Sequence, residues 1–108
     1  GNAFQVAITP SSSSSKILIS ASINVYTDTD NTGVSIFANG TNLGGNTYGF
    51  GRVRTGSNWQ LQYIEFLHSP LTTNEIVYTF AVKREVGNVY VGGDGDGINT
   101  FTAMEIAG

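Results

Sequence analysis

The clearest pattern of hydrophobic and polar positions lies between Lys16 and Thr27, where the two kinds of residue alternate. The apolar positions are Ile17, Ile19, Ala21, Ile23 and Val25, and the polar positions between them are Ser20, Ser22 and Asn24. Only Leu18 and Tyr26 depart from the alternation. Because successive side chains of a strand point to opposite faces, the pattern predicts one long β-strand with a buried face and a wetter face. Such a strand needs partner strands and a second layer over its apolar face.

Further candidate strands recur along the chain, separated by turn-forming residues. They are Phe4–Thr9, Val34–Ala38, Thr41–Leu43, Trp59–Leu67, Glu75–Arg84, Val89–Val91 and Thr100–Ala107. Asn39–Gly40 between two of them is a strong hairpin signal, whereas the glycine- and aromatic-rich stretch 44–51 receives no assignment. No segment has a helical period with caps. The sequence therefore predicts a single all-β domain over residues 1–108, an antiparallel sandwich or barrel.

Composition and charge narrow the possible functions. The chain has 108 residues, no cysteine, 12% charged residues and a net charge of −3. Its five basic residues are scattered, which excludes the dense basic patch that nucleic-acid binding requires. No apolar run is long enough to span a bilayer, so we expect no membrane insertion. The chain begins at Gly1 rather than Met, which fits a processed product, a tag remnant or a fragment of a longer protein.

A glycine-aspartate loop is a candidate calcium site. Asp94 and Asp96 offer oxygen ligands at alternate positions, and Glu105 follows Asp94 at the offset of the bidentate EF-hand glutamate. However, Ile98 occupies the third ligand position, and Glu105 lies in a predicted strand rather than a helix. A tight turn that uses glycines for positive φ explains the same residues. We therefore expect no cofactor, with Asp94, Asp96 and Glu105 as the metal candidates.

The sequence contains no recognisable catalytic set. His68 is the single histidine, there is no cysteine, and no serine lies in a nucleophile-elbow context. Glu65 lies among apolar residues, and an inward carboxylate there would require an ion pair with Arg52 or Arg54. We expect that the protein is not an enzyme.

Aromatic residues suggest a binding surface instead. Tyr48, Phe50, Trp59, Tyr63, Tyr78 and Tyr90 exceed what a small core needs. Sugars are often held by an aromatic face with amide hydrogen bonds at its rim, and the loop-rich segment 42–59 combines these groups. The candidate ligand-binding residues are Asn46, Tyr48, Arg52, Asn58 and Trp59. The alternative is that these aromatic residues pack in the core or at subunit interfaces.

Several segments together carry a resemblance to a known family. In chain order they are Ile8–Ile19, Ile36–Thr41, Ser69–Pro70 with Thr72–Thr73, Ile76–Phe80 and Phe101–Ala107. In this order they resemble a domain at the C-terminus of tail-fibre and other virion proteins of bacteriophages, especially marine and cyanobacterial ones. The resemblance implies a jelly-roll sandwich similar to the tumour-necrosis-factor and complement-C1q heads, usually trimeric. Such domains lie at fibre tips or on capsid surfaces, where they bind host receptors or clamp neighbouring subunits.

The strand pattern itself also favours a subunit interface. The Glu75–Arg84 segment has apolar or small residues on both faces, and so in part does Trp59–Leu67. Two-sided apolar strands are typical of buried interfaces. We therefore expect a homotrimer in a virion that contacts other virion proteins and, as a tail-fibre tip, a host-surface glycan or protein. Two alternatives stay open: a capsid decoration protein that stabilises the head, and a polysaccharide-active enzyme, which would need paired carboxylates across a groove.

Overall fold

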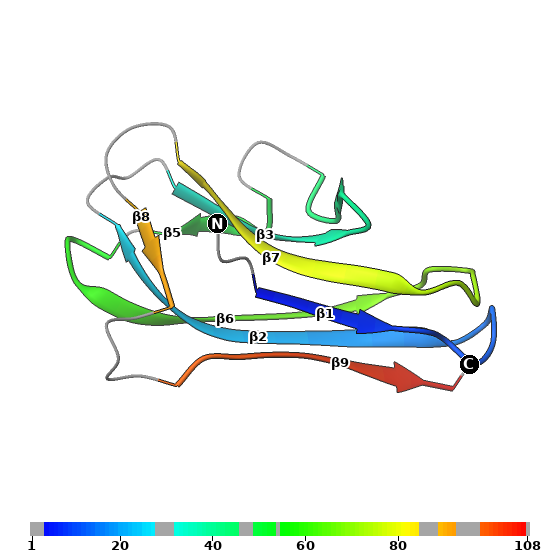
Figure 1. Cartoon of the computed structure of the whole chain (residues 1–108). Helices are drawn as coiled ribbons and strands as arrows, with labels where there is room; N and C mark the ends of the chain where they lie inside the picture. The colour runs from blue at the N-terminus through cyan, green and yellow to red at the C-terminus, as the bar shows by residue number, and fades with distance from the viewer. Residues whose placement is uncertain are drawn as a thin grey trace.

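The chain folds into two antiparallel β-sheets (Figure 1), as seen in a computed structural model that describes residues 4–27, 32–45, 49–53, 55–84, 89–92 and 98–107. The strands are β1 (Phe4–Ile8), β2 (Lys16–Thr27), β3 (Thr32–Ala38), β4 (Thr41–Asn42), β5 (Gly51–Val53), β6 (Trp59–His68), β7 (Ile76–Arg84), β8 (Val89–Val91) and β9 (Thr100–Ile106). Within these ranges there is no helix capable of crossing a membrane. The prediction of an all-β fold is confirmed.

The first sheet is organised around the neighbouring strands β7 and β3, and the second around the single strand β2. In the first, here called the β7 sheet, the order is β1-β7-β3, and both β4 and β5 pair with the far edge of β3. In the second, the β2 sheet, β6 runs along one edge of β2. The other edge of β2 is shared, because β9 pairs with residues 16–22 and β8 with residues 25–27. The two sheets stack as layers of a sandwich (Figure 1).

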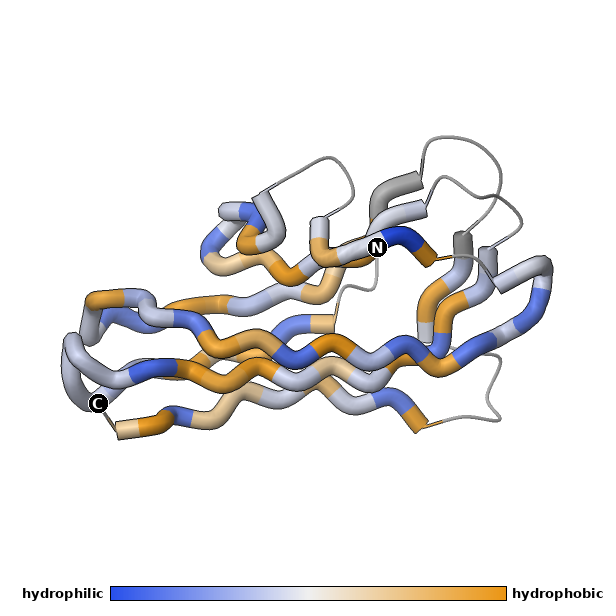
Figure 2. Tube along the Cα trace, turned by 180° about the vertical axis from the view of Figure 1, so that it is seen from behind, coloured by the Kyte–Doolittle hydropathy of each residue, from blue (hydrophilic) through white to orange (hydrophobic). Residues whose placement is uncertain are grey.

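The core lies between the inner faces of the two sheets. The alternation predicted for residues 16–27 is confirmed, since every second residue of β2 is buried, and Figure 2 shows the same alternation along the long strands. The buried apolar side chains of β2 are Ile17, Ile19, Ala21, Ile23 and Val25. Opposite them lie Val34, Ile36, Ala38, Ile76, Tyr78 and Phe80 from β3 and β7. Hydrophobic burial between these two sets of strands holds the layers together.

The predicted hairpin at Asn39–Gly40 is confirmed and joins β3 to β4. Both residues have positive φ, 48° and 86°, which is the conformation of a type I′ turn. Asn39 also connects the hairpin to β7: its amide donates to the Val77 carbonyl at 2.9 Å, and its side-chain Oδ1 accepts from the Val77 amide at 2.9 Å. The turn therefore fixes the position of β3 relative to β7.

The stretch that had no assignment leads into β5. The Phe50 amide donates to the Val34 carbonyl at 2.8 Å, so the chain approaches β3 just before β5 begins. A Cβ atom at Gly49 would lie 2.4 Å from the Ser35 Cβ, and one at Gly44 would lie 2.5 Å from the Gly49 carbonyl carbon. Only glycine permits these approaches. Gly49 therefore lies against the outer side of β3 at Ser35, which is 5% exposed.

Candidate functional site

The outer face of the β2 sheet carries most of the exposed apolar side chains. The described residues include eight large hydrophobic side chains that are exposed, and the pairing register places six of them on this face. They are Leu61, Tyr63, Leu67, Tyr90, Met104 and Ile106. The other two, Leu71 and Ile98, lie outside the strands. Burial of apolar surface is favourable, so a face of this kind is typical of a contact surface.

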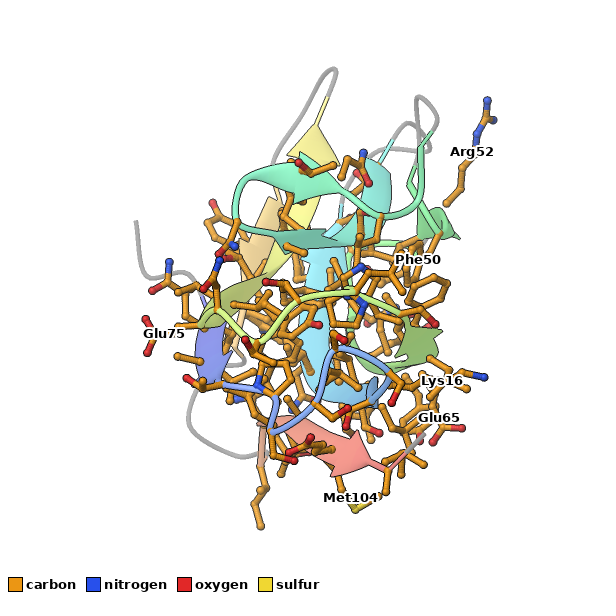
Figure 3. All side chains as sticks on the ribbon, turned by 90° about the vertical axis from the view of Figure 1, so that its right-hand side faces the viewer. Lys16, Phe50, Arg52, Glu65, Glu75 and Met104 are labelled. Atoms are coloured by element: carbon orange, nitrogen blue, oxygen red, sulfur yellow. The ribbon has the colours of Figure 1, made fainter. Side chains whose placement is uncertain are left out.

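One end of this face is aliphatic. Leu18 lies between its register partners Leu67 on β6 and Met104 on β9. Two residues after Met104 on β9, Ile106 pairs with Lys16 of β2. We call Leu18, Leu67, Met104 and Ile106 the aliphatic band. Figure 3 shows Met104 pointing away from the interior of the sandwich. The band is therefore open to solvent in the isolated chain.

The other end of the face is aromatic. Tyr26 lies between its register partners Trp59 on β6 and Tyr90 on β8. The ring centroids of Tyr26 lie 5.7 Å from Trp59 and 5.4 Å from Tyr90, and those of Trp59 and Tyr90 are 6.5 Å apart. We call these three residues the aromatic cluster. Tyr90 is 53% exposed and the other two are half-buried. These tilted rings support one another, as aromatic pairs at these distances do.

A buried threonine pair fixes the backbone beside the aromatic cluster. The Thr27 amide donates to the Thr55 hydroxyl at 2.7 Å, and the Thr55 amide donates to the Thr27 hydroxyl at 3.1 Å. The Thr55 hydroxyl in turn donates to the Thr27 carbonyl at 3.1 Å. Both threonines are buried, so these bonds form away from competing water. They hold the end of β2 against the turn that begins β6.

Amide side chains border the aromatic cluster. Asn99 Oδ1 accepts from the backbone amide and the side-chain amide of Asn24 at 2.8 and 3.1 Å, and the Asn99 amide donates to the Gly92 carbonyl at 2.6 Å. On the other side, the Asn58 amide donates to the Gly56 carbonyl at 3.2 Å. Amide groups held by hydrogen bonds therefore lie near the cluster in the chain, two residues before Tyr26 at Asn24 and directly before Trp59 at Asn58.

The structure divides the predicted ligand-binding set. Asn58 and Trp59 are adjacent at the start of β6, whereas Arg52 lies on the outer face of the β7 sheet, where Figure 3 shows it pointing into solvent. Asn46 and Tyr48 lie outside the described residues. The partners that the structure gives Trp59 are Tyr26 and Tyr90, which the sequence analysis did not select. The available signal was Tyr26, one of the two exceptions to the alternation in β2.

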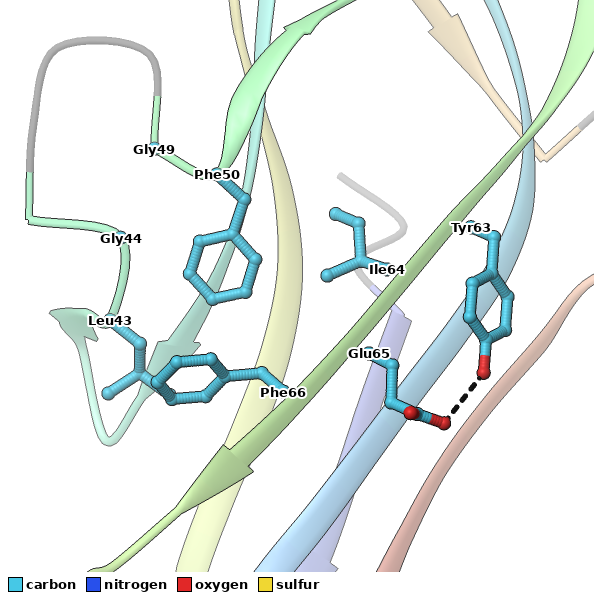
Figure 4. A pocket seen from close by; sticks show the side chains of 8 residues that line it. All are labelled: Leu43, Gly44, Gly49, Phe50, Tyr63, Ile64, Glu65 and Phe66. Carbon is cyan, nitrogen blue, oxygen red and sulfur yellow. Dashed lines mark hydrogen bonds between the residues drawn. The ribbon is translucent and has the colours of Figure 1, made fainter.

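A second feature is a groove at the open edge of the sandwich, with a volume of about 500 Å³. Figure 4 shows Leu43, Phe50 and Phe66 gathered on one side of β6, and the two phenyl centroids lie 5.1 Å apart. On the other side of β6, the Tyr63 hydroxyl donates to Glu65 Oε2 at 2.8 Å. Glu65 is therefore an exposed carboxylate that points outward rather than into the core. The reason is the register, which places Ile64 and Phe66 inward.

His68 makes a hydrogen bond with a core residue. Its Nδ1 lies 2.7 Å from the hydroxyl of Tyr78, a fully buried residue. Burial lowers the pKa of His68 and raises the pKa of Tyr78 to about 12, so both groups are neutral at pH 7. His68 lines a cavity of about 320 Å³, whose described lining includes no acidic side chain. We infer a structural hydrogen bond.

Glu105 also has a structural environment. Its Oε2 accepts hydrogen bonds from the amide and the hydroxyl of Ser11, both at 2.8 Å. A hydrogen bond from the Ser15 side chain, followed by those from Ser11, lowers the pKa of this carboxyl group. The other two calcium candidates, Asp94 and Asp96, lie outside the described residues. Within the described ranges no three acidic or histidine side chains gather to hold a metal ion.

Comparison of the chain with protein-family models, curated protein sequences and solved structures gives no match. Function must therefore be inferred from the fold and its surfaces. Across the described part of the chain, the most distinctive of these surfaces is the apolar outer face of the β2 sheet, with its aliphatic and aromatic ends.

Proposed function

We propose that the protein is a non-catalytic, homotrimeric module of a bacteriophage virion, acting as the receptor-binding tip of a tail fibre. The observation that carries this proposal is the row of exposed apolar side chains on the outer face of the β2 sheet. The resemblance to tail-fibre and virion domains supplies the biological setting. The function is binding and assembly rather than chemistry.

Self-association follows from the cost of leaving this face in water. Leu67 and Met104 are 48% and 54% exposed and lie on either side of Leu18. Burying apolar surface contributes about 25 cal/mol per Å², and monomers rarely leave contiguous apolar patches uncovered. A homo-oligomer would cover this face, and the trimeric state comes from the resemblance to virion domains, in which the band would meet a different surface of the neighbouring copy. We assign the aliphatic band to the contact between subunits.

The strand pairings support a jelly-roll type of sandwich. β3 pairs with β5, β2 with β6 and β1 with β7, so the pairs are nested like those of one long hairpin. The hairpin is then rolled up, since β7 also pairs with β3 and β9 with β2. Nested pairs wrapped in this way are the hallmark of jelly rolls, which are common in viral surface proteins.

The oligomeric state tests the proposal directly. We expect light scattering at micromolar concentration to give about three times the 11.4 kDa chain mass. Leu67→Glu should shift the protein to monomers, because a buried unpaired carboxylate is costly. The matched control is Leu71→Glu, a leucine that is 77% exposed and lies off the sheet, and it should leave the trimer intact. A wild-type monomer would refute the trimer.

A capsid decoration protein is the second candidate, because the same apolar face would also fit a flat site on a head lattice. Antibody labelling of whole virions separates the two possibilities. We expect label at the ends of the tail fibres. Label on the head would replace the fibre-tip proposal with the decoration protein.

A further inference from the structure

We propose that the aromatic cluster Tyr26, Trp59 and Tyr90 binds a pyranose ring of an uncharged glycan. This inference rests on the proposed function, because it names the ligand class and the site of the receptor-binding module. Of the ligand-binding residues expected from the sequence, this site keeps Trp59. It adds Tyr26 and Tyr90, so that the three residues come from three different strands.

The first argument is that the cluster contributes its rings to the surface rather than to the core. Register places all three side chains on the outer face of the β2 sheet, while the inner face is occupied by residues such as Val25. Tyr90 leaves half of its surface in water. The apolar C–H face of a sugar ring can stack on such aromatic faces, so a bound sugar would cover surface that the fold leaves open.

The second argument concerns hydrogen bonding. Within the described part of the chain, the hydroxyls of Tyr26 and Tyr90 and the indole N–H of Trp59 make no hydrogen bond. They are not among the buried atoms that lack a partner, since Thr32 Oγ1 is the described side-chain atom of that kind. The three polar groups of the cluster are therefore open to solvent and available to a ligand. Asn24 adds a further acceptor, because its Oδ1 has no recorded partner among the described residues. Sugar hydroxyls both donate and accept, and so match this mixture.

The third argument identifies the ligand as uncharged. Glu65 pairs with Ser20, six residues before Tyr26 on β2, so it lies roughly 20 Å along the strand from the cluster. Lys16 lies further still along the same strand. The described side chains that border the cluster are amides rather than charged groups. Amide groups of this kind match the hydroxyls of an uncharged sugar.

The fourth argument distinguishes a sugar from a second protein copy. The aliphatic band centres on Leu18, eight residues or about 26 Å from Tyr26, so subunit contact there leaves the aromatic end accessible. Covering the aromatic end with a protein surface would strip water from the amides of Asn24 and Asn58. A sugar supplies hydroxyls at the same positions. The two ends of the face therefore suit two different partners.

Fluorescence provides a direct test, because Trp59 is the single tryptophan of the chain. The probes are the methyl glycosides of glucose, galactose, mannose and N-acetylglucosamine, with N-acetylneuraminate as the anionic comparison. We expect at least one uncharged glycoside to cause a saturable change in Trp59 emission in the millimolar range. Tyr90→Ala should weaken this binding about tenfold, because it removes one stacking face.

Two controls separate this inference from the trimer. Tyr63→Ala removes a tyrosine of the same face outside the cluster and should leave sugar binding unchanged. Leu67→Glu should abolish the trimer without abolishing the response of Trp59 to sugar. The inference is overturned if no uncharged glycoside gives a saturable response. It is also overturned if Trp59 emission follows protein concentration instead of sugar, because a second copy would then cover the cluster.

Discussion

The outer faces of the two sheets are built on the same alternating pattern and yet differ in what they present to solvent. On the β7 sheet most outward residues are small or polar, as at Ala7, Thr79 and Ser35, and the larger outward residues Val77 and Phe37 are partly buried. On the β2 sheet they include Leu67 and Met104, both about half exposed. Alternation alone therefore indicates where the core lies. The size of the outward residues indicates which outer face exposes more apolar surface.

The two faces are also covered differently. Gly49 lies against Ser35 of β3, which is 5% exposed, and Gly44 packs against Gly49. The outer face of β2 has Leu18 and Tyr26 at the centres of the aliphatic band and the aromatic cluster, where neighbouring side chains flank them without covering them. The outer face of the β7 sheet is thus partly covered by its own chain, whereas the outer face of the β2 sheet leaves Leu67 and Met104 about half exposed.

The largest loss of stability should come from a substitution at Gly49, which lies against the outer face of the β7 sheet. Gly49→Ala would place a Cβ 2.4 Å from the Ser35 Cβ at a residue with φ of 62°. We expect a loss of about 3–5 kcal/mol in the free energy of unfolding, from a left-handed conformation plus overpacking. Denaturant titration measures it. Gly45→Ala is the matched control, because it has φ of 71° but no atom within 4 Å of the added Cβ, and should cost only about 1 kcal/mol. Equal losses of stability in the two variants would show that Gly49 is not closely packed against Ser35.

A second prediction compares the two faces of β2 at neighbouring residues. Ile19 is fully buried and should lose about 3 kcal/mol of stability on substitution by alanine, since a cavity remains in the core. Leu18 lies on the outer face, and Leu18→Ala should cost the isolated subunit about 1 kcal/mol or less. It should instead weaken subunit association. Thermal unfolding and light scattering on both variants separate the effects, and the contrast fails if Leu18→Ala leaves association unchanged.

Most strands could be predicted from the sequence because alternation and turn residues are local signals. The limits of β2 and β8 and the turn at Asn39–Gly40 agree with the structure. The strand β5, Gly51–Val53, was missed because its glycine-rich surroundings show no alternation and it is placed by its contact with β3, whereas the equally short β8 has the strand-forming sequence Val-Tyr-Val. Contacts between distant segments leave no local pattern, so short strands of this kind escape.

The candidate site was harder to predict, because periodicity does not say which side of a strand faces inward. In β6 the more apolar side at Trp59, Leu61 and Tyr63 faces outward, while Gln60 and Gln62 occupy the inward register. The pairing of β6 with β2 decides this orientation, and with it the meeting of Trp59 with Tyr26. Proximity in the segment 42–59 suggested Arg52 instead, which the sheet topology places on the other face.

The smallest predicted effect concerns the end of the β2 sheet beside the aliphatic band. The hydrogen bonds from Ser15 and Ser11 lower the pKa of Glu105 in the folded state, so its carboxylate stabilises the fold above the ordinary value of 4.5. This contribution is lost as the pH falls through the lowered pKa. The melting temperature of wild type should therefore exceed that of Glu105→Gln at pH 7, and the difference should shrink below about pH 4.5. If the difference in melting temperature between wild type and Glu105→Gln stayed constant down to pH 2, Ser11 and Ser15 would be held by contacts other than those with this carboxylate.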